Sequence, residues 1–180
     1  MRLNTFENLY ADQLNDLYSA ENQLIQALPK MAEAASTPEL KEAFTLHLEQ
    51  TKQHAEIVKN LLSAVGESAG GEKCKGMEGL LKEGQEVFEK RGDPAVKDAA
   101  LIAAAQRVEH YEIAGYGTAR TFALQLGNND AVNRLQEILN QEAETDELLT
   151  KLATGEGGAE VAINQEAANN NGSQQKSNRR

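Results

Sequence analysis

Two glutamates three residues apart, Glu109 and Glu112, stand in the middle of an otherwise apolar helical pattern. They lie in the stretch QRVEHYEIAGYG, between the runs AALIAAA and TARTFALQL, which are typical of a helix facing a protein core. Residues three apart share one face of a helix. Either this face turns to solvent at the two glutamates, or the core holds a group that carboxylates bind, such as divalent metal ions.

Each of the four long helical patterns in the chain has one polar interruption of its apolar stripe, near its centre. Glu21, for example, follows Leu14 and Leu17 and precedes Leu24 and Leu28. The interrupting residues are Glu21; His47, Gln50 or Thr51, and His54; Glu109 and Glu112; and Glu142 and Asp146.

The positions of the turns place these interruptions at one height. If the first two long helices form an antiparallel hairpin, Glu21 lies level with the turn of helix before His54. In a second hairpin, Glu112 lies level with Glu142 and Asp146. Carboxylates gathered in a low-dielectric interior repel one another and resist desolvation, and divalent cations remove both costs.

Oxygen-rich ligation with some imidazole suits iron or manganese, and two metal ions require bridging carboxylates. The pattern therefore predicts a dinuclear iron or manganese site. We expect His47 at the edge of this site. His110 is expected to be peripheral, because the helical repeat rotates it away from the helix face that carries Glu109 and Glu112. The predicted ligands are Glu21, His54, Glu109, Glu112, Glu142 and Asp146.

Helix start and stop signals define the elements that would position these residues. A hydroxyl residue followed by proline at Thr37-Pro38, and an aspartate followed by proline at Asp93-Pro94, are typical helix starts. Gly66, Gly127 and Gly155 mark helix ends, and Asp130 is the expected cap of the last helix. Helices are predicted over residues 5–35, 38–65, 76–90, 94–126 and 130–154.

The connection lengths predict an all-α fold with two antiparallel hairpins. Two short turns join the first and second long helices and the third and fourth, whereas the crossover between the hairpins is long and carries a short extra helix. This is the ferritin-like arrangement of a four-helix bundle. We expect one bundle domain over residues 1–155 and a disordered, Asn- and Gln-rich tail over residues 156–180.

Composition limits the function classes. The chain has 180 residues and a formal net charge of −10, which argues against nucleic-acid or anionic-membrane partners. The single cysteine, Cys74, excludes an internal disulfide and is interpreted as a reduced loop residue. The N-terminus has no apolar segment typical of export signals, so a cytoplasmic location is expected.

The same residues resemble the YciE/YciF family of ferritin-like bacterial stress proteins. The resemblance spans roughly residues 3–154, through LYSAENQLIQALPKMAEAAS, HLEQTKQH, GMEGLL, ALIAAAQRVEHYEIAGYGT and LNQEAETDELL. It implies a ferritin-like bundle, a homodimer and a role in stress responses, without a settled biochemical activity. Glu109 and Glu112 are also similar to the paired carboxylates of rubrerythrins, which are di-iron enzymes.

Two functions stay open at this point. The first is a stress protein whose dinuclear metal site acts in oxidant defence. The second is a metal-poor, non-enzymatic bundle dimer that acts through protein interactions. The second gains weight from Gln50, because a neutral amide stands there in place of the glutamate that the resemblance leads one to expect, at spacing four from His54.

Overall fold

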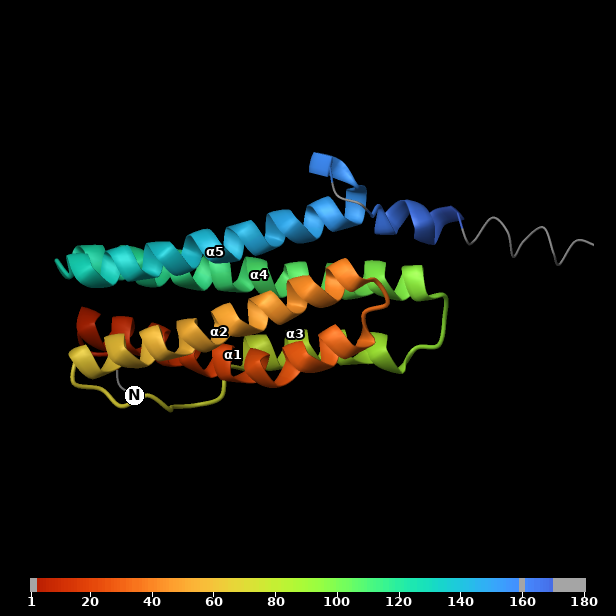
Figure 1. Cartoon of the computed structure of the whole chain (residues 1–180). Coiled ribbons are helices and arrows are strands. Elements are labelled where there is room, and N and C mark those ends of the chain that lie inside the picture. Colours follow the sequence, from red (N-terminus) through yellow and green to blue (C-terminus); the bar gives the residue numbers. More distant parts are fainter. Residues whose placement is uncertain (1–2, 159–160, 170–180) are drawn as a thin grey trace, which may run out of the picture.

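A computed structural model describes residues 3–158 and 161–169 of the chain. These residues form the predicted all-helical architecture (Figure 1). Each observed boundary lies within a few residues of the predicted one. The helices are α1 (Phe6–Ala34), α2 (Pro38–Ala64), α3 (Lys75–Glu89), α4 (Pro94–Gln125) and α5 (Asn129–Thr154), followed by a 3-10 turn, η1 (Glu156–Gly158).

The helices pack as two antiparallel hairpins, as the sequence predicts. Helix α1 lies along α2, and α4 lies along α5, with α1 also contacting α4 and α2 contacting α5 (Figure 1). The crossover between α2 and α4 carries α3, which packs mainly on α4 and also on α1. The result is a four-helix bundle with one long connection.

The turn between α1 and α2 is held by a residue from another helix. Thr37 is the N-cap residue of α2, but its side chain makes no capping hydrogen bond. Instead the buried Asp98 of α4 accepts hydrogen bonds from the backbone N–H groups of Ser36 and Thr37, at 2.8 and 3.0 Å, and from the Ser36 hydroxyl at 2.7 Å. This tertiary cap joins the two hairpins at one end of the bundle.

The residue predicted to cap α4 does so, whereas the N-cap of α5 is a different residue from the predicted one. Asp93 accepts hydrogen bonds from the backbone N–H groups of Ala95 and Val96. In α5, however, the cap is Asn128, which accepts from the N–H of Ala131 at 3.1 Å. Asp130 instead lies in the first turn, where its charge pairs with Arg134.

The apolar core consists of two clusters, and every long helix contributes to both. In α1 the switch between clusters falls between Leu17 and Leu24, and in α4 between Val108 and Tyr116. In α2 and α5 it likewise falls near mid-helix. The polar interruptions of the sequence pattern therefore occupy the layer between two apolar halves of one bundle.

Gly115 lies on the side of α4 that faces Leu17 of α1, beside this layer. A Cβ atom at Gly115 would lie 2.8 Å from Cδ2 of Leu17, nearer than side chains pack. The glycine is unfavourable within a helix but leaves room for the Leu17 side chain, which would have to shift if a Cβ atom were present.

The prediction of a disordered tail is wrong for residues 161–169. Residues 163–169 form a short helix, visible beyond the end of α5 in Figure 1. Ile163 is fully buried in one core cluster, Val161 packs against that cluster and Ala167 is also buried. Apolar residues four apart cover one helical face, and this short signal lies within an Asn- and Gln-rich stretch. Residues 159–160 and 170–180 of the predicted tail lie outside the described residues.

Ile163→Ala should lower the free energy of unfolding by about 2 kcal/mol, since it deletes a buried side chain at the edge of the core. Local undocking of the short helix limits the loss. Chemical denaturation measures the effect, with the exposed Gln165→Ala as the control. Equal stability of Ile163→Ala and the native protein would show that the segment does not dock.

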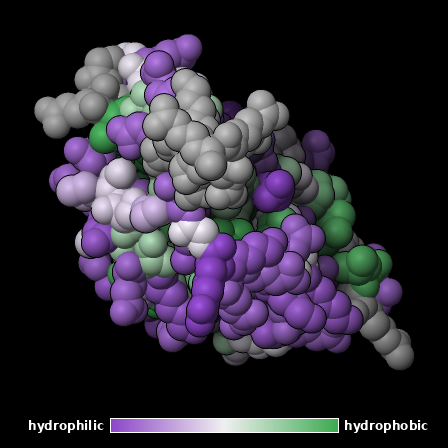
Figure 2. Space-filling view, turned by 90° about the vertical axis from the view of Figure 1, so that its right-hand side faces the viewer, coloured by the Kyte–Doolittle hydropathy of each residue, from purple (hydrophilic) through white to green (hydrophobic). Residues whose placement is uncertain are grey.

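The bundle exterior is mostly polar. Seen from the end that carries the α1–α2 turn and the α3–α4 connection, hydrophilic side chains cover most of the surface and hydrophobic ones show in smaller, separate areas (Figure 2). Among the described residues, no helix is long and apolar enough to cross a membrane.

Candidate metal centre

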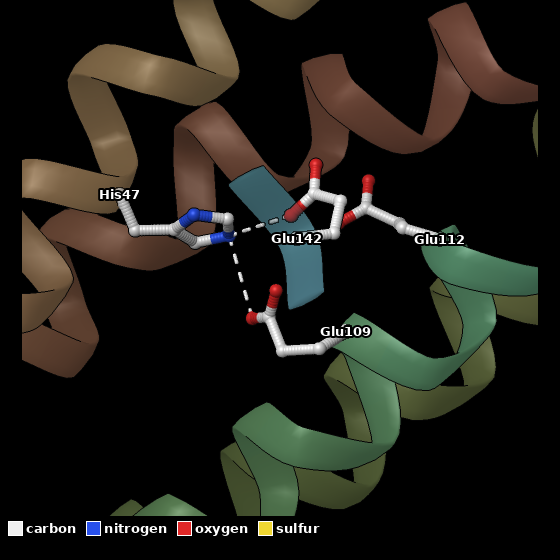
Figure 3. A group of neighbouring side chains, drawn as sticks. All are labelled: His47, Glu109, Glu112 and Glu142. Carbon is white, nitrogen blue, oxygen red and sulfur yellow. Dashed lines mark ion pairs between the residues drawn. The ribbon is translucent and has the colours of Figure 1, made fainter. Parts of the chain in front are cut away.

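Glu109 and Glu112 point into the bundle and not into solvent. Their side chains are 1% and 0% exposed, on the face that α4 presents to the other three long helices. Figure 3 shows both carboxylates directed from α4 toward His47 of α2 and Glu142 of α5. The polar interruption of the apolar stripe is thus a buried site.

The first of two ligand groups combines these residues. His47, Glu109, Glu112 and Glu142 each offer one ligand atom, and these atoms all lie within 4.8 Å of one another. Nε2 of His47 lies 3.4 Å from Oε1 of Glu109 and 3.9 Å from Oε2 of Glu142. All four side chains are buried.

The second ligand group consists of Glu21, His54 and Glu142, with ligand atoms again within 4.8 Å of one another. Nδ1 of His54 lies 3.0 Å from Oε1 of Glu142 and 3.6 Å from Oε1 of Glu21. Glu142 therefore belongs to both groups, so its carboxylate would be shared if each group held an ion. Among the described residues, no further set of His, Cys, Asp and Glu gathers in this way.

Many inner atoms of this centre lack a hydrogen bond, although several lie within ion-pair distance of an imidazole. Buried polar atoms normally have partners. Of the described buried side-chain atoms without one, eight belong to these six residues. They are Oε2 of Glu21, Nε2 of His47, Nδ1 of His54, Oε2 of Glu109, and both carboxylate oxygens of Glu112 and of Glu142. Once deprotonated, these atoms are electron-pair donors of the kind that bind metal ions.

Burial dominates the electrostatics of three of the carboxylates. It raises the pKa of Glu109 and Glu112 well above the usual value, and repulsion from neighbouring carboxylates adds to the effect. Burial also raises the pKa of Glu21 to about 7, although contacts with His54 and Tyr116 oppose the shift. Without cations, the centre therefore favours neutral glutamic acids.

The two histidines respond in opposite ways. Burial alone would lower the pKa of His54, but contacts with Glu142 and Glu21 raise it to about 10. The pKa of Glu142 is lowered because its contacts with His54 and His47 outweigh the effect of burial. Burial lowers the pKa of His47. The metal-free centre thus contains a His54–Glu142 ion pair and a neutral His47.

Five of the six predicted ligands lie together, and Asp146 does not. Asp146 is part-buried and accepts a hydrogen bond from Nε2 of Gln106 at 3.0 Å. Its other oxygen lies 3.5 Å from Nε2 of His110, whose side chain is 69% exposed. His110 is therefore peripheral, as predicted, and Asp146 is at the edge of the centre with it.

His47 belongs to a candidate ligand group, although the sequence did not place it among the predicted ligands. It was expected at the edge of the site, but it is 2% exposed and faces Glu109. Its distance of seven residues from His54, two turns on one face, was the available signal. The position that is buried one turn before His54 is Thr51, whereas Gln50 is half-buried and contacts His47.

Tyr116 and Cys74 are both more constrained than the sequence indicates. The buried Tyr116 hydroxyl donates a hydrogen bond to Oε1 of Glu21, which leaves Oε2 for another partner. Cys74 is buried at the N-terminus of α3, with Sγ 2.9 Å from the Tyr111 hydroxyl and 3.2 Å from Oδ2 of Asp16. The cysteine is thus a packed residue and not a loop bystander.

Comparison with known proteins gives consistent relatives. Residues 5–168 match the family described as Domain of unknown function (DUF892), a match that includes the docked segment after α5. The chain is 46% identical over 154 residues to Protein YciF of Escherichia coli (strain K12), covering 85% of this chain and 93% of that protein.

Solved structures agree with the fold. The crystal structure of the E. coli stress protein YciF superposes with a TM-score of 0.81 at 46% identity, covering 84% of this chain and 96% of that one. YcfI from Rhodopseudomonas palustris gives 0.80 at 40% identity, with the same coverage. A ferritin-like, diiron-carboxylate protein from Bacillus anthracis gives 0.66 at 16% identity, covering 83% and 99%, which confirms the ferritin-like fold.

Proposed function

The chain belongs to the DUF892 family, and we propose that the centre of its ferritin-like bundle binds two iron or manganese ions and serves oxidant defence under stress. The E. coli relative is described as a stress protein, and the B. anthracis neighbour as a diiron-carboxylate protein. The observation that carries the proposal belongs to this chain: two buried ligand groups that share Glu142 and contain eight polar atoms without hydrogen bonds.

Charge supports two ions in place of one. The two groups together contain four carboxylates and two imidazoles. Four ionised carboxylates carry the charge that two divalent cations neutralise, and neutral imidazoles leave this balance unchanged. A buried centre of this composition is therefore compensated by a pair of divalent ions.

The donor set also equals that of di-iron bundles, although the helices share it differently. Such bundles combine one Glu from each of two helices with a Glu-x-x-His motif from each of the other two. Here α2 supplies two imidazoles and no carboxylate, and α4 supplies two carboxylates, whereas α1 and α5 supply one carboxylate each. Thr51 and Thr145 occupy the buried positions at spacing three from His54 and Glu142.

The residues prepare the centre for redox chemistry. A pair of iron or manganese ions supplies redox chemistry with peroxide or dioxygen. The two apolar clusters exclude water from both sides of the centre. The Tyr116 hydroxyl donates a hydrogen bond to Oε1 of Glu21, the oxygen that lies 3.6 Å from Nδ1 of His54, and Oε2 of Glu21 has no hydrogen-bond partner. Oxygen and imidazole donors favour iron or manganese over metals that prefer thiolate ligands.

Metal analysis tests the proposal. We expect about two ions of iron or manganese per chain after purification without chelator and anaerobic reconstitution, as a bridged pair requires. Because one group offers four residues and the other three, calorimetric titration should resolve two unequal affinities. A chain that stays metal-free under these conditions would instead support the non-enzymatic bundle.

We also propose, from the family resemblance, that the protein is a homodimer in the cytoplasm. Light scattering of the purified full-length chain measures the assembly. A monomer at micromolar concentration would contradict the dimer without affecting the metal centre, since all six ligand residues come from one chain.

A further inference from the structure

The two imidazoles of the centre are held by side chains of α5 on their outer edges. His54 turns Nδ1 toward Glu142 and Glu21, and its opposite nitrogen, Nε2, lies 2.7 Å from Oε1 of Gln141. Gln141 is half-buried and directly precedes Glu142, so one turn of α5 contacts both edges of the same ring.

The chemistry of this contact fixes where the proton of His54 lies. A neutral imidazole has one N–H donor and one electron-pair donor, and an amide oxygen accepts hydrogen bonds only. Nε2 must therefore donate to Gln141 in the protonated and in the neutral ring alike, so the electron pair of the neutral ring lies on Nδ1. That nitrogen is buried, has no hydrogen-bond partner and faces the two carboxylates.

We propose that Gln141 is a positioning residue that keeps the proton of His54 on Nε2 and thereby directs Nδ1 to the ion bound with Glu21 and Glu142. The inference rests on the proposed metal site. It goes further by assigning which ring nitrogen binds and which residue, outside the ligand set, decides this. With an ion bound by Nδ1, the Nδ1 proton of the ion pair would have been released to solvent, and the Nε2 proton would stay on its hydrogen bond to Gln141.

His47 has the opposite orientation and a weaker outer contact. Its Nε2 faces Glu109 and Glu142, and its Nδ1 lies 3.5 Å from the hydroxyl of Thr145. This distance is at the limit of a hydrogen bond, whereas 2.7 Å is short for one to a ring nitrogen. The two imidazoles thus bind through different nitrogens, and Gln141 holds its ring more firmly than Thr145 does.

Zinc(II) titration and ¹⁵N-histidine NMR test the inference, with zinc as a diamagnetic probe. In the zinc-loaded native protein, we expect Nδ1 of His54 to show a metal-bound shift and Nε2 to keep a slowly exchanging proton. Gln141→Met should weaken zinc binding at this group by about 10- to 100-fold and expose that proton to exchange. Gln141→Glu, which keeps an acceptor oxygen, should preserve both signals.

The control is Gln136→Met, five residues earlier on α5, because the Gln136 side chain bonds only to Asn140 among the described contacts. The inference is overturned if His54 of the zinc-loaded native protein carries its proton on Nδ1. This outcome can be observed without any variant. It is also overturned if Gln141→Met binds zinc as tightly as the control. A native protein that binds no zinc would instead refute the proposed metal site, and the inference with it.

Discussion

Glu142→Gln should remove nearly all of the stabilisation that Fe(II) or Mn(II) gives the protein at pH 8, whereas Glu112→Gln should remove about half of it. The difference follows from geometry, because Glu142 belongs to both ligand groups and Glu112 to one. An ion at 1,000 times its Kd stabilises the native state by about 4 kcal/mol, so the loss is large for either variant.

The measurement compares denaturation of each variant with and without metal under anaerobic conditions. Using this difference cancels the effect of each substitution on the metal-free protein, where Glu142 pairs with His54. Metal content should fall to one ion per chain for Glu112→Gln and to none for Glu142→Gln. The exposed Glu144→Gln on the same helix is the control and should bind as the native protein does. Two tightly bound ions in Glu142→Gln would show that Glu142 does not bridge.

The ferritin-like fold could be predicted because its determinants are local. Proline after a capping residue begins α2 and α4, and the long connection between them implies one crossover. The common height of the polar interruptions followed from the two short turns. Helix periodicity and turn position therefore suffice to bring Glu21, Glu112 and Glu142 into one layer.

The features that the sequence did not reveal depend on tertiary contacts. Asp146 lies about 40° from Glu142 around α5, by the helical repeat, and this rotation takes it to Gln106 instead of the centre. The cap of α2 comes from Asp98, 61 positions after Thr37. The docking of Ile163 depends on a core surface that no pattern within residues 156–180 describes.

A difference of one residue in helical position decides whether Gln50 or Thr51 faces the candidate metal centre. From the sequence, Gln50 is expected to occupy a ligand position, because it lies four residues before His54. The structure turns Thr51 inward, at spacing three, and leaves Gln50 half-buried beside His47. Gln50 therefore gives less support to a metal-poor centre. Helix α2 supplies no carboxylate, but α4 supplies two, so the number of carboxylates is kept.

The metal-free protein should be more stable at pH 5 than at pH 8, by at least about 2 kcal/mol when each shifted pKa unit counts about 1.4 kcal/mol. A pKa raised by folding contributes stability at low pH that is lost as the pH rises through the folded value. Glu21 has a folded pKa of about 7, so its contribution is lost between pH 4.5 and 7. The raised pKa values of Glu109 and Glu112 act in the same direction.

The two histidines act in opposite directions in this window. His54, with a folded pKa of about 10, stabilises the native state below pH 6.5 and loses part of that effect by pH 8. His47 has a lowered pKa, so protonation of the unfolded chain costs stability at pH 5. The lowered pKa of Glu142 matters mainly below pH 5. The carboxylates therefore decide the sign.

Glu112→Gln separates this centre from the general repulsion of an acidic protein. Glutamine keeps the shape of a protonated glutamic acid but cannot ionise, so the metal-free variant should be more stable than the native protein at pH 8 and nearly equal at pH 5. Glu144→Gln removes one negative charge from an exposed site and should leave the pH dependence unchanged.

Urea denaturation in chelator at the two pH values measures all three proteins. A parallel pH dependence for Glu112→Gln and Glu144→Gln would mean that folding does not raise the pKa of Glu112. With Fe(II) or Mn(II) present, the native protein should instead be more stable at pH 8 than at pH 5. The ions bind the ionised carboxylates and replace the protons taken up at low pH.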